Sequence, residues 1–286
     1  MRHAARMQLP VAVANARELS REVVRSVRAQ RASDALHTPA PPTAGFVLDV
    51  GAGQSPTPRA DLVVDKYAAD NFERASDLSF AKALVIGDGQ ALPFADGTFA
   101  YVIASHVLEH ATDPPLFAAE LSRVAQAGWA QVPSRESELT FGWPFHPWLI
   151  DLDKPDVLVF EARGERRAPS GRLFHEAARD SYMFRLWMGA HKGLWYHSVH
   201  WRGSLHVRCE DESAAEAVAS FDVQQTVDVL GRAAASGPAG VLREALRCPV
   251  DRGELTESAG RMTCADCDRS YPVAGTVPVL LAEAAS

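Results

Sequence analysis

Residues 46–53 read Phe-Val-Leu-Asp-Val-Gly-Ala-Gly, and this stretch decides the fold of the chain. The apolar run before the first glycine contains a single aspartate and is typical of a buried strand. The glycines that follow predict a tight turn, where the backbone takes positive φ and approaches a ligand closely. Further apolar segments at 62–64, 83–86 and 101–104 predict more strands, with helical stretches between the later ones. Strands separated by crossovers predict an α/β fold, with a parallel sheet covered by helices on both faces.

An acidic residue stands in or just after each of the first three predicted strands. Asp49 lies within the first strand, Asp65 ends the second and Asp88 follows the third. Because open parallel sheets bind ligands at the carboxyl ends of their strands, Asp65 is placed to bind a ribose diol and Asp88 an adenine amine. The third glycine of a dinucleotide fingerprint is absent, with Pro56 in its place. Asp49 also stands where a nicotinamide site usually has an apolar residue.

Four ordered blocks over about residues 46–133 resemble the class I S-adenosylmethionine (SAM)-dependent methyltransferases: VLDVGAG, VVDKY, GDGQALPFADGTFAYVIASHVLEH and RVAQAGWAQVP. The resemblance implies a doubly wound, Rossmann-like sheet that binds SAM. Only 11 residues separate Gly53 from Asp65, so the usual first helix is expected to be very short or replaced by a loop. By analogy with the family, the cofactor-binding residues are Asp49, Gly51, Ala52 and Gly53 for the methionine part, Asp65 for the ribose, Asp88, Gly89 and Gln90 for the adenine, and Ser105 beside the methyl group. Lys66 is a further cofactor-binding candidate.

The segment His106-Val107-Leu108-Glu109-His110 has the spacing of a metalloprotease motif. It follows the fourth strand, where HxxEH is a common spelling in the family that the chain resembles, so we do not expect a metal there. His106 is the candidate general base for an acceptor that must lose a proton, and packing against cofactor or substrate is the alternative. Methyl transfer itself mostly requires alignment of the reacting atoms. His110 is expected to be a helix-packing residue.

The aromatic-rich segment of about 136–205 is predicted to be a substrate lid. The loop at 136–148 would line the acceptor pocket with a mostly apolar wall, in which His146 is the titratable group and a second catalytic candidate. The alternative is that these aromatic residues form the core of the inserted lid. Glu136 and Glu138 are expected in a solvated loop, and recognition of a cationic acceptor is the alternative. The proposed wall consists of Trp143, Phe145, His146 and Trp148.

Three of the four cysteines lie in the last 40 residues, in the segments Cys248-Pro-Val-Asp251 and Cys264-Ala-Asp-Cys267. With the following Tyr271-Pro-Val, this tail resembles the small zinc-ribbon proteins related to the methyltransferase activator subunit of eukaryotes. The resemblance implies a zinc-ribbon-like β domain over 241–286, although Asp251 stands where the second cysteine of the pattern belongs. Zinc held by three thiolates and one carboxylate is chemically possible, and a metal-free ribbon is the alternative. The candidate zinc ligands are Cys248, Asp251, Cys264 and Cys267.

Composition and charge narrow the class of partner. The chain has 29 Lys+Arg against 36 Asp+Glu, a net charge of −7, and such acidity disfavours nucleic acid. No apolar stretch reaches the ~20 residues that span a bilayer, and the apolar run near the N-terminus is too short for a signal peptide. We therefore expect a cytoplasmic protein without membrane partners. It is divided into an N-terminal helix and linker (1–43, with the helix at 16–31), a methyltransferase domain (44–240) and the ribbon (241–286).

The sequence thus predicts a SAM-dependent methyltransferase that modifies O or N of a small-molecule acceptor. One alternative is methylation of RNA or a translation protein, with the ribbon as a built-in activator. Another is a non-catalytic SAM-binding scaffold. The acidity favours a small acceptor, as does Asp113-Pro114-Pro115, which begins a helix rather than forming the Asp/Asn-Pro-Pro-aromatic motif of amide methylation. The ribbon is the candidate surface for a homo-oligomer or a protein partner.

Overall fold

The computed structural model describes residues 18, 21, 24, 25, 28, 31, 34, 37–71, 76–154, 156–164, 166, 168–210 and 221–286. Most of the helix predicted at 16–31 lies outside these residues. Its described positions are helical, and Val24, which belongs to the predicted apolar stripe, is 51% exposed. None of the helices in the described part of the chain combines the length and apolarity needed to cross a membrane.

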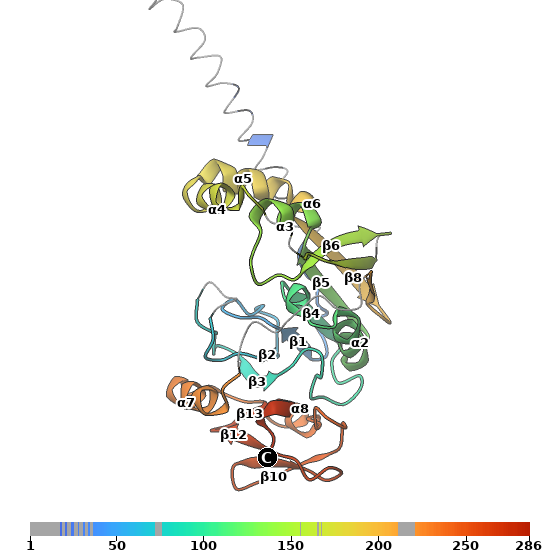
Figure 1. The fold of residues 1–286 in the computed structure, drawn as a ribbon. Coiled ribbons are helices and arrows are strands. Elements are labelled where there is room, and N and C mark those ends of the chain that lie inside the picture. Colours follow the sequence, from blue (N-terminus) through green and yellow to red (C-terminus); the bar gives the residue numbers. More distant parts are fainter. Residues whose placement is uncertain are drawn as a thin grey trace, which may run out of the picture.

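Six strands form the centre of the main sheet: β1 (Val47–Val50), β2 (Leu62–Asp65), β3 (Ala83–Gly87), β4 (Tyr101–Ser105), β5 (Ala127–Pro133) and β8 (Tyr196–Arg202). Their order is β3-β2-β1-β4-β5-β8, and only β8 runs antiparallel to its neighbour (Figure 1). The four strands predicted from the sequence are present within one residue of their expected bounds. This order is that of a doubly wound sheet, whose switch point lies between β1 and β4.

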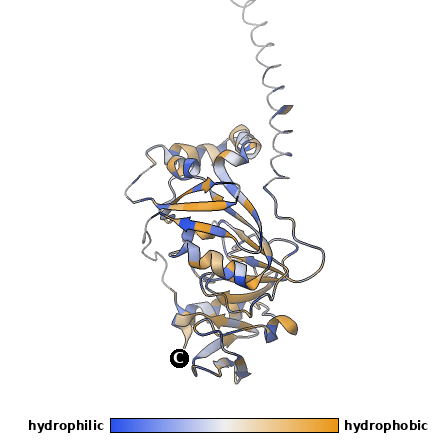
Figure 2. Cartoon of the chain, turned by 90° about the vertical axis from the view of Figure 1, so that its right-hand side faces the viewer, coloured by the Kyte–Doolittle hydropathy of each residue, from blue (hydrophilic) through white to orange (hydrophobic). Residues whose placement is uncertain are grey.

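Both faces of the sheet are covered, as predicted. Every residue of β1 and β2 is buried, which is typical of parallel strands between two layers. On one face, the helix α2 (Pro114–Val124) contributes Phe117 and Leu121 to the main core. On the other face, the helix α7 (Val223–Ala233) packs Leu230 into a second cluster with Val63 and Ile86. Figure 2 shows the central strands as largely hydrophobic.

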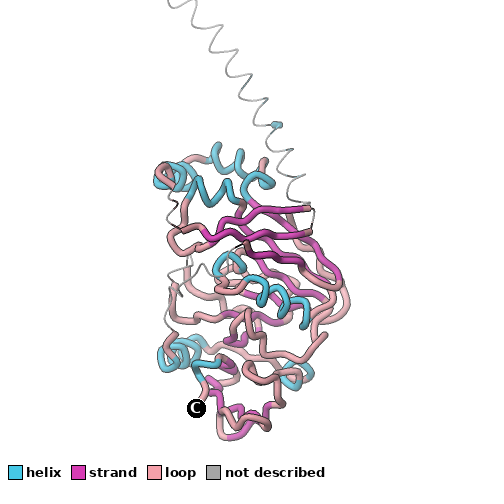
Figure 3. The backbone as a smooth tube through the Cα atoms, turned by 45° about the vertical axis from the view of Figure 1, so that its right-hand side comes forward, coloured by secondary structure: helices cyan, strands magenta, loops and turns pink. Residues whose placement is uncertain are grey.

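In the described residues, the connections between the first four strands contain only loops and turns (Figure 3). Residues 51–61 join β1 to β2 through turns, which confirms that a loop replaces the usual first helix. The helical stretches expected before β3 and β4 are absent from the described residues 66–71, 76–82 and 88–100. Local hydrogen bonds close two of the loops. Thr57 N donates to Asp49 in the loop after β1, and Gln90 N donates to Asp88 in the loop after β3.

The segment after β5 builds a helical layer and a second sheet. The helices lie together at the top of Figure 1, and the strand β8 returns from them into the main sheet, so the predicted lid also supplies a sheet strand. A short 3-10 helix, η1 (Leu108–His110), contacts both β5 and β6. The strand β6 belongs to a separate three-stranded sheet, β6-β7-β9. The bounds are Arg135–Phe141 (α3), Trp148–Asp153 (β6), Val157–Ala162 (β7), Gly171–Asp180 (α4), Tyr182–Ala190 (α5), Lys192–Trp195 (α6) and His206–Cys209 (β9).

The C-terminal residues form a small β unit that continues the main sheet. Its elements are α8 (Val241–Glu244), β10 (Leu255–Ser258), β11 (Arg261–Cys264), β12 (Ser270–Ala274), β13 (Val277–Leu280) and η2 (Ala282–Ala284). β13 pairs in parallel with β3, with Val279 opposite Ile86, so the complete sheet has ten strands. The unit thereby covers what would otherwise be an open sheet edge at β3.

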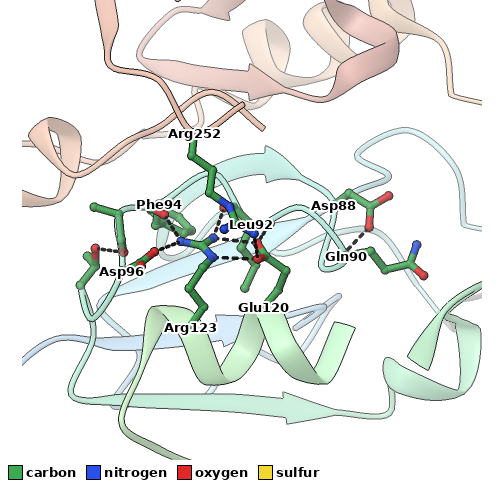
Figure 4. A network of polar contacts seen from close by, with 10 residues as sticks. Asp88, Gln90, Leu92, Phe94, Asp96, Glu120, Arg123 and Arg252 are labelled. Atoms are coloured by element: carbon green, nitrogen blue, oxygen red, sulfur yellow. Dashed lines mark hydrogen bonds and ion pairs between the residues drawn. The ribbon is translucent and has the colours of Figure 1, made fainter. Parts of the chain in front are cut away.

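A buried ion pair ties this unit to α2 (Figure 4). Arg123 donates to both carboxylate oxygens of Glu120 at 2.7 Å, and Glu120 is only 3% exposed. The same guanidinium donates to the carbonyl oxygens of Leu92 and Phe94. Arg252 of the C-terminal unit donates to Glu120 at 2.9 Å. The Glu120 carboxylate therefore links α2 to the loop after β3, through Leu92 N, and to the C-terminal unit, through Arg252.

Candidate functional site

Two of the predicted acids lie side by side at the switch point of the sheet. Asp49 is 2% exposed, and its Oδ2 accepts a hydrogen bond of 2.7 Å from the backbone N–H of Thr57. Asp65 is 8% exposed, and its two oxygens accept from the backbone N–H groups of Gly53 and Tyr67, each at 3.2 Å. The Asp65 carboxylate thus fixes the glycine turn. A carboxylate oxygen can accept more than one hydrogen bond, so a group held by backbone N–H donors can also accept from a ligand hydroxyl.

Burial raises the pKa of Asp49 to about 6. The hydrogen bonds from Thr57 act in the opposite direction, and the negative charge of Asp65 adds to the effect of burial. A cationic group of a ligand would stabilise the ionised form of such a carboxylate. The methionine part of SAM carries such groups.

The predicted adenine-binding segment is held by its own side chains. Asp88 Oδ1 accepts from the backbone N–H of Gln90 at 2.8 Å, and Asp88 Oδ2 lies 2.7 Å from Lys66 Nζ. Lys66 also lies 3.5 Å from Glu283 of η2. Gln90 Oε1 accepts from Thr112 Oγ1 at 3.0 Å. Lys66 is therefore an ion-pair partner of Asp88 in this structure, and the Gln90 side chain anchors the loop before α2.

Two glycines of the site are required by close packing. Gly51 has φ +67°, and a Cβ there would lie 2.4 Å from Val107 Cγ2. A Cβ on Gly89 would lie 2.0 Å from the ring of Phe117 on α2. Ala52 lies in the same turn, where its carbonyl accepts from Ser55 at 3.0 Å. Glycine at these two positions therefore allows Val107 and Phe117 to pack directly against the backbone of the turns.

These residues fit SAM in the chemistry of their donors and acceptors. Asp49, Asp65 and Asp88 stand at the carboxyl ends of three adjacent strands, and their order along the edge matches the methionine, ribose and adenine parts. The buried Asp49 offers a negative charge, and Asp65 offers lone pairs to a diol. Ser105 ends β4 across the switch point and is half-buried.

His106 follows Ser105 and has φ 54°, which is strained for a residue with a Cβ. Its Nδ1 lies 3.2 Å from Glu109 Oε1 and its Nε2 lies 3.1 Å from Gln131 Oε1, while the side chain is 40% exposed. Burial opposes the charge on His106, but the hydrogen bond and charge of Glu109 outweigh it and raise the pKa. With an acceptor at each nitrogen, the ring is arranged to donate from both.

The predicted aromatic wall is largely an internal cluster. Trp148 is 1% exposed and donates from Nε1 to the carbonyl oxygen of Ala111 at 2.7 Å, so it is a core residue. Trp143 stacks on Phe141 with 4.9 Å between ring centroids. Phe145 stacks on His110 at 5.8 Å. The structure thus has these aromatic rings packed against each other, which agrees with the alternative of a lid core.

His146 and Glu138 form a buried pair that was not predicted from the sequence. The expectation that Glu138 lies in a solvated loop is wrong, because it belongs to α3 and is 1% exposed. His146 is 6% exposed, and its Nδ1 lies 2.6 Å from Glu138 Oε1. Ser134 caps α3, which turns Glu138 inward one helical turn later. The signal in the sequence for this helix is Ser134 followed by a short helical pattern.

The cysteines of the tail converge on one point. Cys248 Sγ lies 3.8 Å from Cys267 Sγ, and Cys264 Sγ lies 3.3 Å from Asp251 Oδ1. Ligands of a tetrahedral zinc with Zn–S near ~2.3 Å are about 3.5–3.8 Å apart, so the four groups fit the ion. A Cβ on Gly253 would lie 2.7 Å from Cys264 Sγ, which explains a glycine at the closest approach of the backbone.

The described residues 48–129 match the family model of a methyltransferase domain. The demethylmenaquinone methyltransferase of Renibacterium salmoninarum is 38% identical over 109 residues, which are 35% of this chain and 44% of that protein. The chain therefore spans less than half of the length of this curated relative.

The chain is also similar in part to solved structures of methyltransferases. An S-adenosylmethionine-dependent methyltransferase from Mesorhizobium loti is 11% identical, with 60% of this chain and 96% of that chain covered and a TM-score of 0.34. A complex of the Trm112 methyltransferase activator of Haloferax volcanii with a methyltransferase is 15% identical, with 67% and 94% covered and a TM-score of 0.36. The family match and the sheet order together support a class I methyltransferase domain over residues 48–129, with S-adenosylmethionine as its cofactor.

Proposed function

We propose that this protein transfers a methyl group from SAM to an oxygen or nitrogen atom of a small-molecule acceptor. The observation that carries the proposal is the row of three acids, Asp49, Asp65 and Asp88, along the carboxyl edge of adjacent parallel strands. The relative from Renibacterium salmoninarum is named for a small acceptor, demethylmenaquinone, which supports this class. The acidic net charge of −7 also favours a small acceptor over nucleic acid.

In this proposal the chain binds and orients, and the cofactor supplies an electrophilic methyl group on a sulfonium sulfur. Asp65 accepts hydrogen bonds from the ribose hydroxyls, and Asp49 opposes the positive charge of the methionine part. Ser105 and His106 border the methyl group at the end of β4. Alignment of acceptor, methyl carbon and sulfur then provides most of the acceleration.

The surroundings of His106 favour hydrogen-bond donation over the role of general base. Both of its nitrogens face oxygen acceptors, Glu109 Oε1 and Gln131 Oε1, so neither presents a lone pair to an acceptor proton. The ring therefore shapes the wall beside the methyl group at the end of β4. His146 is a positioning residue rather than a catalytic one, because Glu138 and neighbouring rings enclose it.

We further propose that the C-terminal unit holds one structural zinc at Cys248, Asp251, Cys264 and Cys267. Purified protein should then contain zinc, and Cys264→Ser should release it while Cys209→Ser, outside the cluster, should not. Asp251→Cys should tighten binding, because it adds a fourth thiolate. Folded protein that takes up no zinc would contradict this assignment.

The methyl transfer itself is tested with SAM that carries a deuterated methyl group. We expect mass spectrometry of a small-molecule extract to show a labelled product with wild type but not with Asp65→Ala. Label in RNA or protein instead would favour the macromolecular alternative. SAM binding with no transfer to any fraction would favour a non-catalytic scaffold.

A further inference from the structure

We propose that Glu109, His110 and His146 form a second metal site, for a divalent transition-metal ion, next to the candidate methyl-transfer site. The ligand atoms of these three residues all lie within 4.8 Å of one another. Glu109 and His110 belong to η1 at the end of β4, and His146 comes from the segment between α3 and β6. The HxxEH motif thus contributes its last two residues, and a histidine 36 positions later along the chain completes the set.

The spacing suits a small ion after slight closure. Atoms bound to a tetrahedral ion at ~2.1 Å lie about 3.4 Å apart, so a maximum separation of 4.8 Å requires only side-chain rotation inward. The rings of His110 and His146 are 4.7 Å apart and nearly perpendicular, at 83°. Two imidazoles that share one ion can point their nitrogens at it from such an arrangement.

Hydrogen bonds prepare His146 as a ligand. Its Nδ1 lies 2.6 Å from Glu138 Oε1, and a carboxylate there accepts a hydrogen bond from Nδ1–H, which keeps the proton on Nδ1. The lone pair of a neutral imidazole is then on Nε2, the nitrogen that faces away from Glu138. Carboxylate–histidine–metal arrangements of this type orient the ring and increase its basicity. Glu138 would be the partner of the ligand rather than a ligand itself.

Glu109 presents a buried oxygen that the described structure leaves without a hydrogen bond. Its Oε1 lies 3.2 Å from His106 Nδ1, whereas Oε2 has no hydrogen-bond partner among the described residues, and the residue is 1% exposed. Glu138 Oε2 also has none, with Arg163 at 3.9 Å. Unsatisfied buried carboxylate oxygens are costly. A divalent cation beside both carboxylates would offset that cost.

The ligand set indicates the class of metal. Two histidines and one carboxylate bind Zn²⁺ or Fe²⁺, whereas Mg²⁺ prefers oxygen ligands. Three protein ligands leave at least one coordination position open for an outside oxygen. If the proposed function holds, that position would bind an oxygen of the acceptor beside His106. Metal binding itself does not depend on methyl transfer and is measured without SAM.

The test compares metal content in four proteins after equilibration with Zn²⁺, Fe²⁺ or Mg²⁺ and removal of free metal. They are wild type, Glu109→Gln, His146→Gln and the matched control His206→Gln, whose histidine is exposed on β9. The cysteine cluster contributes equally to all four. We expect Zn²⁺ or Fe²⁺ to decrease by one equivalent in Glu109→Gln and His146→Gln only, and Mg²⁺ not to be retained. Equal zinc and iron content in the four folded proteins would overturn the proposal.

A second measurement uses wild type alone and so does not depend on the folding of the variants. Crystals soaked with Zn²⁺ should give an anomalous-scattering peak between Glu109, His110 and His146, separate from any peak at the cysteines. Absence of that peak in crystals whose cysteine cluster is loaded would overturn the site. Binding that survives in His146→Gln would overturn the ligand assignment.

Discussion

At the scale of single residues, the chemistry of this protein depends mainly on buried carboxylates. Asp49, Asp65, Glu109, Glu120 and Glu138 are each less than 9% exposed. Burial of an ionised carboxylate is costly unless a partner compensates it. Glu120 has two arginines, and Glu109 and Glu138 have histidines. Asp49 has only neutral donors in the described structure, which makes it the acid most sensitive to pH and to a cationic ligand.

Asp49→Asn should stabilise the ligand-free protein at pH 7.5. The pKa of Asp49 is raised from 3.8 to about 6, so the folded state binds more protons than the unfolded state between these values. The contribution of Asp49 to the free energy of unfolding therefore falls as pH rises through this window, by on the order of 3 kcal/mol at most. Urea unfolding should show the variant about 1–3 kcal/mol more stable at pH 7.5 and close to wild type at pH 4. A difference that does not change with pH would refute this account of Asp49.

His106→Gln should leave SAM binding intact and reduce turnover by roughly tenfold, less than the 10²–10⁴-fold typical of a lost general base. The reason is that Glu109 and Gln131 engage both nitrogens, so the ring shapes the pocket rather than removing a proton from the acceptor. Turnover is measured with the acceptor found in the labelling screen, alongside calorimetry of SAM binding. A loss of 10³-fold or more with SAM affinity unchanged would instead assign His106 the role of base.

At the scale of single elements, α2 shows how a predicted helix acquires its place. Asp113 caps its first turn by accepting from Leu116 N at 2.9 Å, as the Asp-Pro-Pro sequence predicts. Its position on the sheet depends on Glu120 and Arg123. The local sequence of such a pair, three residues apart, is the same whether the pair is buried or exposed on the surface of a helix. Local capping was therefore readable from the sequence, whereas the buried ion pair packs against the carbonyl oxygens of Leu92 and Phe94, in a loop about 30 residues earlier in the chain.

Arg123→Ala should destabilise the protein by about 3–5 kcal/mol, because it leaves Glu120 buried with a weaker partner. The carbonyl oxygens of Leu92 and Phe94 lose the same donor. Arg252→Ala is the matched control: its side chain is 56% exposed, so it should cost less than about 1 kcal/mol. Denaturant unfolding of both variants decides this, and equal losses would show that the Glu120–Arg123 pair is not buried in solution.

The same contrast explains which parts of the site could be predicted. The acids at strand ends follow from strand periodicity and the rule that ligands bind at the carboxyl edge, so Asp49, Asp65 and Asp88 were found from sequence. The cysteine cluster follows from spacing. His146 and Glu138 meet because the loop after α3 turns back on the helix, and no local pattern shows this contact between residues eight positions apart. The loop connections before β3 and β4 were also missed, since short polar segments do not distinguish turns from short helices.

At the scale of the whole molecule, the C-terminal unit and the methyltransferase domain share one sheet and one core. β13 pairs with β3, and Met262, Tyr271 and Leu280 belong to the same buried cluster as Leu48 and Val50. We therefore expect one cooperative unfolding transition in calorimetry. Val279→Ala truncates a fully buried side chain where β13 meets β3. It should lower the midpoint temperature of that single transition without dividing it into two. Two separate transitions would contradict a continuous core.

The measurement that tests the account most directly is calorimetric titration of the protein with SAM and with its demethylated product. We predict one site per chain for each ligand, and a loss of about 1.5–3 kcal/mol, or roughly 10- to 150-fold in Kd, for Asp65→Ala. Asp156→Ala, which removes an exposed carboxylate from the segment between β6 and β7, is the control and should bind like wild type. No binding of either ligand to folded wild type, or equal affinity in Asp65→Ala, would contradict the assignment of the carboxyl edge as a SAM site.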